Sequence, residues 1–287
     1  MRRLIVNADD FGLTPAVNRA IALANQQGVV TSATIMANSR AFQDAADLAR
    51  KQPTLKTGCH VVLIDGEPIT ANATTLTNGS TRFRSSLKGF AEAAVRKQIA
   101  PAEVQHEAEA QIRKIQSTGL SVTHVDSHKH THMFPHVLRP VLRAARACGV
   151  TAVRNPFEPW RCWPKPVLLG SAAMWLRSAG VACFGIFAGA FLRAVQDERM
   201  FTTDGTIGIV ATGKLDLSVL LATLEALPEG TWELVCHPGY SDADLQATGT
   251  RLMKSREIEL EALTSPEVRS EISRRGISLI SYADLVL

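Results

Sequence analysis

The feature that most constrains the fold of this 287-residue chain is a repeated alternation between short β-rich runs and amphipathic helical patterns. The β-rich runs lie at residues 4–7, 31–36, 58–63, 122–126, 151–154, 208–211, 233–236 and 277–281. The helical patterns lie between most of them, at residues 14–27, 40–51, 101–117, 136–148, 217–227 and 251–263. Strands that alternate with helices of this length predict βα units and a parallel sheet. This many units favour an α/β fold built as an irregular (β/α) barrel, with a doubly wound sheet as the alternative.

Neither a shift in composition nor an internal repeat divides the chain, so we expect one domain over residues 1–287. Two segments depart from the alternation. Residues 65–87 are rich in Thr, Asn, Ser and Gly, which predicts a long surface loop of the kind that often has a functional role.

The other segment, residues 156–195, is an apolar insertion that we expect to be helical, and it contains Trp160, Trp163 and Trp175. Its uncharged stretch at 178–192 is shorter than a membrane span requires. A buried pair of helices would explain it. An apolar lid or groove near the active site, in contact with a lipid-like substrate or a membrane surface, would explain it equally well.

Composition narrows the function classes. The net charge is +4, but Lys and Arg are scattered along the chain, so we expect no nucleic-acid partner. The five cysteines form no C-x-x-C pair, which argues against a disulfide framework or a cysteine zinc site. The first apolar run, residues 4–6, is too short for a secretory signal. We therefore expect a cytoplasmic protein with reduced thiols, and leave peripheral contact with the inner membrane surface open.

Histidines are the strongest chemical signal in the sequence. His124, His128, His130, His132 and His136 lie together in a block that begins on an expected strand and continues past its C-terminal end. Neutral imidazole is a common ligand of transition metals. Because side chains alternate along a strand, His124, Asp126 and His128 would share one face. Asp126 could then orient a ligating histidine, although any single histidine of the block could instead be structural.

Three further groups follow or approach the ends of expected strands. Asp9 and Asp10 are adjacent, which costs electrostatic repulsion unless a cation or hydrogen-bond donors absorb it, whereas a helix cap would need only one carboxylate. His60 lies in an otherwise apolar run and could be a core histidine. His237 lies in the turn Cys-His-Pro-Gly and could be only a turn residue.

The C-terminal ends of the strands are where (β/α) barrels build their active sites. One carboxylate and two imidazoles can hold a metal ion and leave positions open for water and substrate. A bound metal lowers the pKa of water and polarises a carbonyl, and a spare aspartate and a spare histidine could serve as base and acid. The residues therefore indicate a metal-dependent hydrolase.

The order of the motifs resembles the YdjC-like carbohydrate deacetylases. They are N-A-D-D-F-G at 7–12, G-x-H at 58–60, H-V-D-S-H-K-H-T-H-M-F-P at 124–135 and C-H-P-G-Y at 236–240. The resemblance implies an irregular (β/α) barrel that uses one divalent metal ion to remove N-acetyl groups from amino sugars. Zinc is the expected ion, with magnesium as the alternative.

Carried onto this chain residue by residue, the resemblance also implies roles. The metal ligands would be Asp10, His60 and His128, the general base would be Asp9, and the general acid would be His237. Around them we expect supporting or substrate-contacting residues, namely Phe11, Asp126, His130, His132 and Arg154.

Within the family, the segment R-N-P-F-E-P-W at 154–160 and the apolar stretch after it look most like the deacetylases associated with hopanoid biosynthesis. That resemblance implies an N-acetylglucosaminyl hopanoid as substrate, with free amine and acetate as products. The alternative substrate is a chitooligosaccharide such as diacetylchitobiose. The apolar stretch could equally be a homodimer interface.

Two other classes of function stay open. One is a metal-dependent phosphoesterase, which often assembles two metal ions where the deacetylase needs one. The other is a non-enzymatic metal-binding or sensor protein, which would leave Asp9, His60 and His237 without a role.

Overall fold

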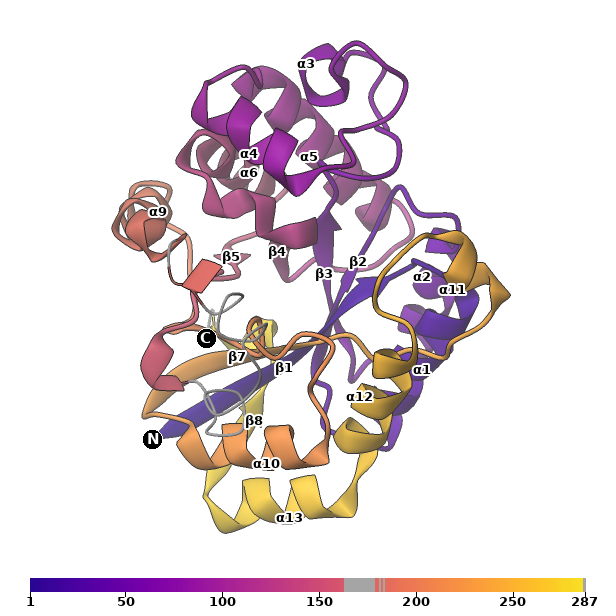
Figure 1. The fold of residues 1–287 in the computed structure, drawn as a ribbon, viewed down its shortest axis with the longest axis vertical. Coiled ribbons are helices and arrows are strands. Elements are labelled where there is room, and N and C mark those ends of the chain that lie inside the picture. Colours follow the sequence, from indigo (N-terminus) through magenta and orange to yellow (C-terminus); the bar gives the residue numbers. More distant parts are fainter. Residues whose placement is uncertain (163–178, 181, 183, 286–287) are drawn as a thin grey trace.

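The computed structural model describes residues 1–162, 179–180, 182 and 184–285. An eight-stranded sheet whose paired strands are all parallel lies at the centre of the described part, and helices surround it (Figure 1). The strands are β1 Arg2–Phe11, β2 Ser32–Ile35, β3 Lys56–Val61, β4 His124–Ser127, β5 Ala152–Val153, β6 Gly205–Ile207, β7 Gly230–Cys236 and β8 Ile277–Ile280.

Helices follow most of the strands and lie outside the sheet (Figure 1). The α-helices that the structure describes are α1 Pro15–Gln26, α2 Phe42–Lys51, α3 Thr74–Thr77, α4 Leu87–Val95, α5 Pro101–Gln116, α6 Pro135–Ala147, α9 Ala188–Asp197, α10 Leu217–Ala226, α11 Ala243–Ala247, α12 Lys254–Thr264 and α13 Pro266–Arg274. Short 3₁₀ turns lie at His128–Met133, Trp160–Cys162, Gly185–Phe187 and Tyr282–Leu285.

Strand β1 is the centre of the sheet, in the order β5-β4-β3-β2-β1-β7-β6. One edge of β1 pairs with β7 along residues 2–8. The other edge pairs with β8 at residues 2–5 and with β2 at residues 7–11, where the register shifts between Ala8 and Phe11. Bulges of this kind re-aim side chains and are common beside active sites. Here the bulge contains the adjacent aspartates.

The outer strands of the sheet approach each other, so that the sheet curls towards a barrel. The backbone N–H of Val153 in β5 donates to Phe201 O, and the N–H of Phe201 donates to Thr151 O. A single isolated bridge between Ala152 and Phe201 results, shortly before β6. The sheet is therefore curled into an incomplete barrel, which confirms the fold class that the sequence predicts.

The first helix shows why the chain turns where it does. Thr14 is the N-cap of α1, its Oγ1 accepts the N–H of Val17, and Pro15 occupies the first turn. Proline suits that position because its missing N–H would have no partner there, so the expected start of this helix is confirmed.

One expected strand is wrong. Residues 208–211 are not a strand, and β6 lies just before them, at Gly205–Ile207. The carboxylate of Glu158 accepts the N–H groups of Gly208 and Val210, at 3.1 and 2.8 Å, so a side chain binds the backbone that a neighbouring strand would otherwise pair. Gly208 also has φ +96°, a conformation that an extended strand does not allow.

The expected loop at 65–87 is largely irregular and contains the short helix α3. Two glutamates of α5 hold it: Glu107 accepts the N–H groups of Ile69 and Thr70, and Glu103 accepts the N–H of Thr75. The expected apolar insertion at 156–195 falls partly outside the described residues. Its described part contains the 3₁₀ turns at Trp160–Cys162 and Gly185–Phe187 and most of α9, whereas its place in a single domain stays a prediction. Among the described residues, no helix has the length and apolar character needed to cross a membrane.

The core next to the site gives a first test. An added Cβ at Gly58 in β3 would lie 2.4 Å from Cε1 of His124, whose ring stacks on Tyr282 with centroids 3.7 Å apart. Because that ring cannot move away, we expect Gly58→Ala to lower the free energy of unfolding by about 1–3 kcal/mol. Gly89→Ala in α4 is the control, because the nearest atom to its added Cβ is 3.8 Å away. Urea unfolding would measure both, and equal midpoints would refute the crowding.

Candidate active site

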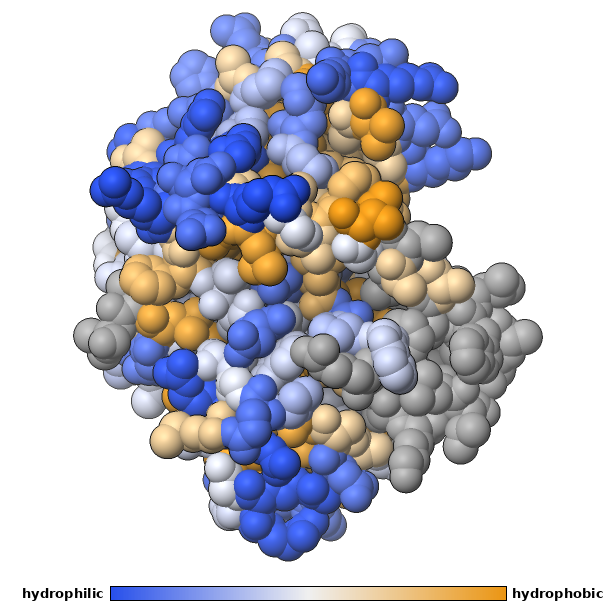
Figure 2. Space-filling model, turned by 90° about the vertical axis from the view of Figure 1, so that its left-hand side faces the viewer, coloured by the Kyte–Doolittle hydropathy of each residue, from blue (hydrophilic) through white to orange (hydrophobic). Residues whose placement is uncertain are grey.

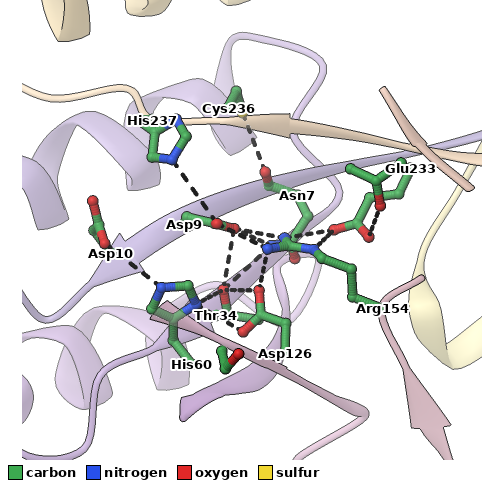
Figure 3. Close-up of polar contacts among 12 residues, drawn as sticks. Asn7, Asp9, Asp10, Thr34, His60, Asp126, Arg154, Glu233, Cys236 and His237 are labelled. Atoms are coloured by element: carbon green, nitrogen blue, oxygen red, sulfur yellow. Dashed lines mark hydrogen bonds and ion pairs between the residues drawn. The ribbon is translucent and has the colours of Figure 1, made fainter. Parts of the chain in front are cut away.

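The predicted functional residues converge where the strands end. Figure 3 shows Asp9 and Asp10 from β1, His60 from β3 and Asp126 from β4 facing one another. Arg154 follows β5, Glu233 lies on β7, and His237 follows the end of β7. The shared position of strand ends in a parallel barrel brings together residues that lie far apart in the sequence.

The side chains of Asp10 and His60, together with that of His128 just after β4, point their donor atoms at one space. Asp10 Oδ1 lies 3.7 Å from His60 Nε2 and 3.5 Å from His128 Nδ1, and the two imidazole nitrogens are 3.3 Å apart. All three donor atoms lie within 4.8 Å of one another. His60 and Asp10 are buried, whereas the His128 side chain is 22% exposed and marks the open side. One carboxylate and two imidazoles suit zinc and several other divalent ions.

Asp126 fixes the orientation of the His60 ring through Nδ1, the ring nitrogen that faces away from the donor cluster. His60 Nδ1 lies 2.7 Å from Asp126 Oδ1, so the tautomer with a proton on Nδ1 donates to the carboxylate and leaves Nε2 facing Asp10 and His128. Thr34 Oγ1 donates to Asp126 Oδ2 at 3.1 Å and holds the carboxylate in turn. Burial favours the neutral ring, but the carboxylates of Asp126 and Asp9 outweigh it and raise the pKa of His60 to about 9. The pocket therefore attracts positive charge.

Arg154 joins three buried carboxylates. Its Nη1 and Nη2 donate to the two oxygens of Asp9 at 2.9 and 2.6 Å. Nη1 is 2.6 Å from Asp126 Oδ2, and Nη2 is 2.6 Å from Glu233 Oε1. The Tyr282 hydroxyl donates to the other oxygen of Glu233. Burial alone would penalise the charged guanidinium, yet these carboxylates raise the pKa of Arg154 well above its usual value.

The two adjacent aspartates have different surroundings. Asp9 is held by Arg154 and by the Asn7 side-chain amide, which donates to Asp9 Oδ1 at 3.0 Å. Asp10 has φ +66°, and Arg256 Nη2 donates to its Oδ2 at 2.5 Å. Burial favours the protonated acids, but Arg154 and Arg256 respectively outweigh it and hold the pKa values of Asp9 and Asp10 below the usual range. Both are therefore carboxylates at neutral pH.

His237 and His60 lie on opposite sides of Asp9 (Figure 3). His237 Nε2 is 3.9 Å from Asp9 Oδ2, and His237 Nδ1 is 3.9 Å from Glu259 Oε2. Burial lowers the pKa of His237 to about 4, although the carboxylates of Asp9 and Asp10 act in the opposite direction. Burial also raises the pKa of the Glu259 carboxyl to about 7.

The rest of the histidine block supports the fold around the site. His124 Nε2 lies 3.1 Å from Asn7 Oδ1, and His136 Nε2 lies 3.0 Å from Ile99 O. His132 lies between Ser127 Oγ, 2.6 Å from its Nδ1, and Arg154 O, 3.2 Å from its Nε2, and so helps to place Arg154.

His130 has φ +54° and a buried Nδ1 without a hydrogen-bond partner in the described part of the chain. Phe11 is fully buried in the hydrophobic core. The structure therefore brings His128 alone of the five histidines into the donor cluster.

Several residues that contact the functional side chains carried no signal in the sequence. Arg256 and Glu259 lie on α12, where the helical pattern predicts only that their positions are buried. Asp65, in the loop 65–87, lies 3.8 Å from His128 Nε2 and 2.5 Å from Lys129 Nζ.

The incomplete parallel barrel carries an Asp/His/His cluster and, beside it, an aspartate–histidine pair. This combination is typical of the active site of a hydrolytic α/β protein. Comparison with known proteins agrees, because the YdjC-like protein family model matches residues 3–274. The chain belongs to the YdjC-like family.

Relatives match over the whole chain. A carbohydrate deacetylase of Brevibacillus brevis is 33% identical over 288 residues, which cover 99% of each chain. A chitooligosaccharide deacetylase of Citrobacter koseri is 33% identical over 285 residues, again 99% of each chain. A crystal structure of a candidate cellobiose-phosphate cleavage protein from Enterococcus faecalis superposes with a TM-score of 0.78 at 29% identity, covering 99% of this chain and 98% of the other.

The buried charge cluster can be tested by removing its centre. We expect Arg154→Leu to lower the free energy of unfolding by about 3–5 kcal/mol, because it leaves Asp9, Asp126 and Glu233 without their counter-charge. Burial then raises the pKa of these carboxyls above their values in the unfolded chain, so stability is retained at low pH and lost as pH rises. The loss relative to wild type should be larger at pH 8 than at pH 5.

Arg139→Leu is the matched control, because Arg139 pairs with Asp197 at the surface and the two side chains are 43% and 57% exposed. It should cost less than about 1 kcal/mol at either pH. Chemical unfolding at both pH values measures all of these differences. A loss for Arg154→Leu that is the same at pH 5 and pH 8 would contradict the assignment.

Proposed function

We propose that this chain is a metal-dependent N-deacetylase of acetylated amino sugars. The observation that carries the proposal is the pairing of two functional units at one strand-end surface. Asp10, His60 and His128 offer convergent metal donors, and Asp9 and His237 lie beside them with 3.9 Å between carboxylate and ring. The names of the relatives support the same reaction on carbohydrates.

The charge of the site supports a divalent ion. Around the cluster, four buried carboxylates face two buried guanidinium groups, which leaves two negative charges when all are ionised and His60 is neutral, as a metal ligand must be. They are Asp9, Asp10, Asp126 and Glu233 against Arg154 and Arg256. One divalent ion would neutralise this excess, and buried charge is costly unless it is paired. Zinc fits the Asp/His/His donors best, and magnesium is the alternative.

Such an ion, when bound, would polarise the acetyl carbonyl and lower the pKa of water. Arg154 and Asn7 hold the Asp9 carboxylate in place. Asp9 accepts the proton of the attacking water. A bond forms between the water oxygen and the acetyl carbon, and the bond from that carbon to the sugar nitrogen breaks.

The leaving nitrogen requires a proton, and His237 supplies it. Since burial keeps the pKa of His237 near 4 in the free site, the ring does not hold a proton permanently at neutral pH. Asp9 Oδ2 lies 3.9 Å from His237 Nε2, so a small movement of the ring would bring the two atoms within hydrogen-bond distance and let the proton taken from water pass to the ring. The products are the free amine and acetate.

For the substrate we propose an N-acetylglucosaminyl hopanoid, with a chitooligosaccharide such as diacetylchitobiose as the alternative. Trp160, Ile186 and Leu192 are 74%, 79% and 50% exposed, and they lie on either side of the sequence outside the described residues. Figure 2 shows apolar side chains interrupting the hydrophilic surface on the face that carries α9. A polycyclic lipid would use such a surface. We accordingly propose a cytoplasmic enzyme that works at the inner membrane surface, with homodimerisation as the competing use of the face.

The metal and the reaction can be tested together. Wild type should bind about one equivalent of zinc and release acetate from N-acetylglucosaminyl hopanoid faster than from diacetylchitobiose, and a chelator should abolish both rates. His128→Ala should lose zinc and activity together, whereas His136→Ala, outside the donor cluster, should keep both.

Metal analysis and an acetate assay measure these outcomes. Full zinc occupancy in His128→Ala would point to His130 as the ligand instead. Two equivalents of metal would favour the phosphoesterase, and zinc binding without hydrolysis of any N-acetyl sugar would favour the sensor.

The acid and the base can be separated by the leaving group. Asp9→Asn should keep the metal and lose about 10²–10⁴-fold in rate on amides and esters alike, because both need the water deprotonated. His237→Ala should also keep the metal but slow acetamides far more than acetate esters, whose leaving oxygen needs less help from an acid. Steady-state rates on matched amide and ester substrates measure the difference. Equal losses in His237→Ala would reassign it to positioning or carbonyl contact.

A further inference from the structure

Helix α12 carries two charged side chains on its buried face, in the part of the chain that follows the last recognised motif. Arg256 and Glu259 are each 1% exposed and lie three residues apart, so they occupy neighbouring positions on one side of the helix. Charged residues are almost never fully buried unless they are paired. Each of these two reaches a different member of the proposed catalytic machinery.

Arg256 holds the proposed ligand Asp10. Its Nη2 donates to Asp10 Oδ2 at 2.5 Å, and its Nε donates to Leu252 O at 3.1 Å, which fixes the guanidinium plane. With Oδ2 occupied, Asp10 presents Oδ1 to His60 and His128, at 3.7 and 3.5 Å. The guanidinium therefore selects which carboxylate oxygen faces the cluster.

The turn after β7 is shaped to admit this arginine. A Cβ at Gly239 would lie 2.9 Å from Arg256 Cδ, and the N–H of Gly239 donates to Arg256 O at 3.2 Å. The glycine of the Cys-His-Pro-Gly turn is thus required by the approach of Arg256, and the same turn carries His237.

Glu259 holds the proposed acid His237. Its Oε2 accepts the backbone N–H of His237 at 2.6 Å, while its Oε1 accepts the N–H of Gly213 at 3.2 Å. The same Oε2 lies 3.9 Å from His237 Nδ1, which is buried and has no hydrogen-bond partner in the part of the chain that the structure describes. A small rotation of the ring would give Nδ1–H an acceptor and leave Nε2 facing Asp9.

We propose that α12 positions the two halves of the site separately, with Arg256 acting through Asp10 on metal binding and Glu259 acting through His237 on proton delivery. The inference rests on the proposed function, which it extends to a helix that none of the motifs includes. If the inference is right, the two effects can be separated by mutation. A change at Arg256 affects affinity for the ion, and a change at Glu259 affects the protonation of the leaving group.

The test compares Arg256→Lys and Glu259→Gln in the full chain. We expect Arg256→Lys to weaken zinc affinity in equilibrium dialysis by about 10–100-fold, with an unchanged ratio of amide to ester hydrolysis once zinc is saturating. We expect Glu259→Gln to keep wild-type zinc affinity and to lower the amide-to-ester ratio about tenfold. Lys254→Met and Glu261→Gln are matched controls on the exposed face of α12, and both should match wild type in affinity and ratio.

Thermal unfolding of each variant separates positioning from a loss of folding. If Arg256→Lys does not fold, Gly239→Ala displaces the arginine by a single methyl group, and if Glu259→Gln does not fold, Glu259→Asp withdraws the carboxylate. Lower melting temperatures with unchanged zinc affinity and an unchanged amide-to-ester ratio would overturn the inference. A wild type that binds no zinc or hydrolyses no acetamide would instead refute the proposed function itself.

Discussion

The structure depends on the buried guanidinium of Arg154. This one group holds carboxylates from β1, β4 and β7 and lies directly after β5, so four strands of the curled sheet meet at a single cation. Isolated charges in a protein interior are expensive, and the arrangement persists because each charge has a partner and further hydrogen bonds. The same interactions therefore fix the geometry of the site and hold the strand ends together. Asp9 and Asp126 owe their ionised state to it, and Asp126 in turn sets the ring of His60.

The bulge in β1 separates the environments of two neighbouring carboxylates. In a regular strand, adjacent side chains point to opposite faces, and one of the two aspartates would leave the site. The register shift and the left-handed backbone of Asp10 turn it towards His60, His128 and Arg256 instead. Asp9 keeps its contact with Arg154. Repulsion between the two is relieved by two separate arginines, each of which binds one aspartate.

The sequence predicted the parts of the molecule that depend on periodicity and strand ends. The parallel curled sheet was predictable because short apolar runs alternate with helical patterns, and the convergence of Asp10, His60 and His128 follows from the common edge that such strands share. The expected strand at 208–211 is wrong because the contact that displaces it comes from Glu158, about fifty residues earlier in the chain. Arg256 and Glu259 could not be predicted, because a helical pattern reports burial and says nothing about which distant carboxylate or imidazole a side chain will meet.

The two margins of the curled sheet, β5 and the segment before β6, meet at a seam. This seam affects how the chain length and surface of such a barrel can vary. In the part of the chain that the structure describes, one isolated bridge, Ala152 with Phe201, joins the two margins of the sheet there, whereas β1 is paired along both edges. The pairing of β1 with β2, β7 and β8 does not involve the chain between the two margins, so that chain can change in length and in polarity without loss of these strand pairs. Asp9, Asp10, His60 and Glu233, by contrast, lie on β1, β3 and β7, which pair with neighbouring strands away from the seam, whereas Arg154 itself follows β5 at the margin of the sheet. A fold of this kind can acquire a new substrate surface at its seam while the reacting groups stay where they are.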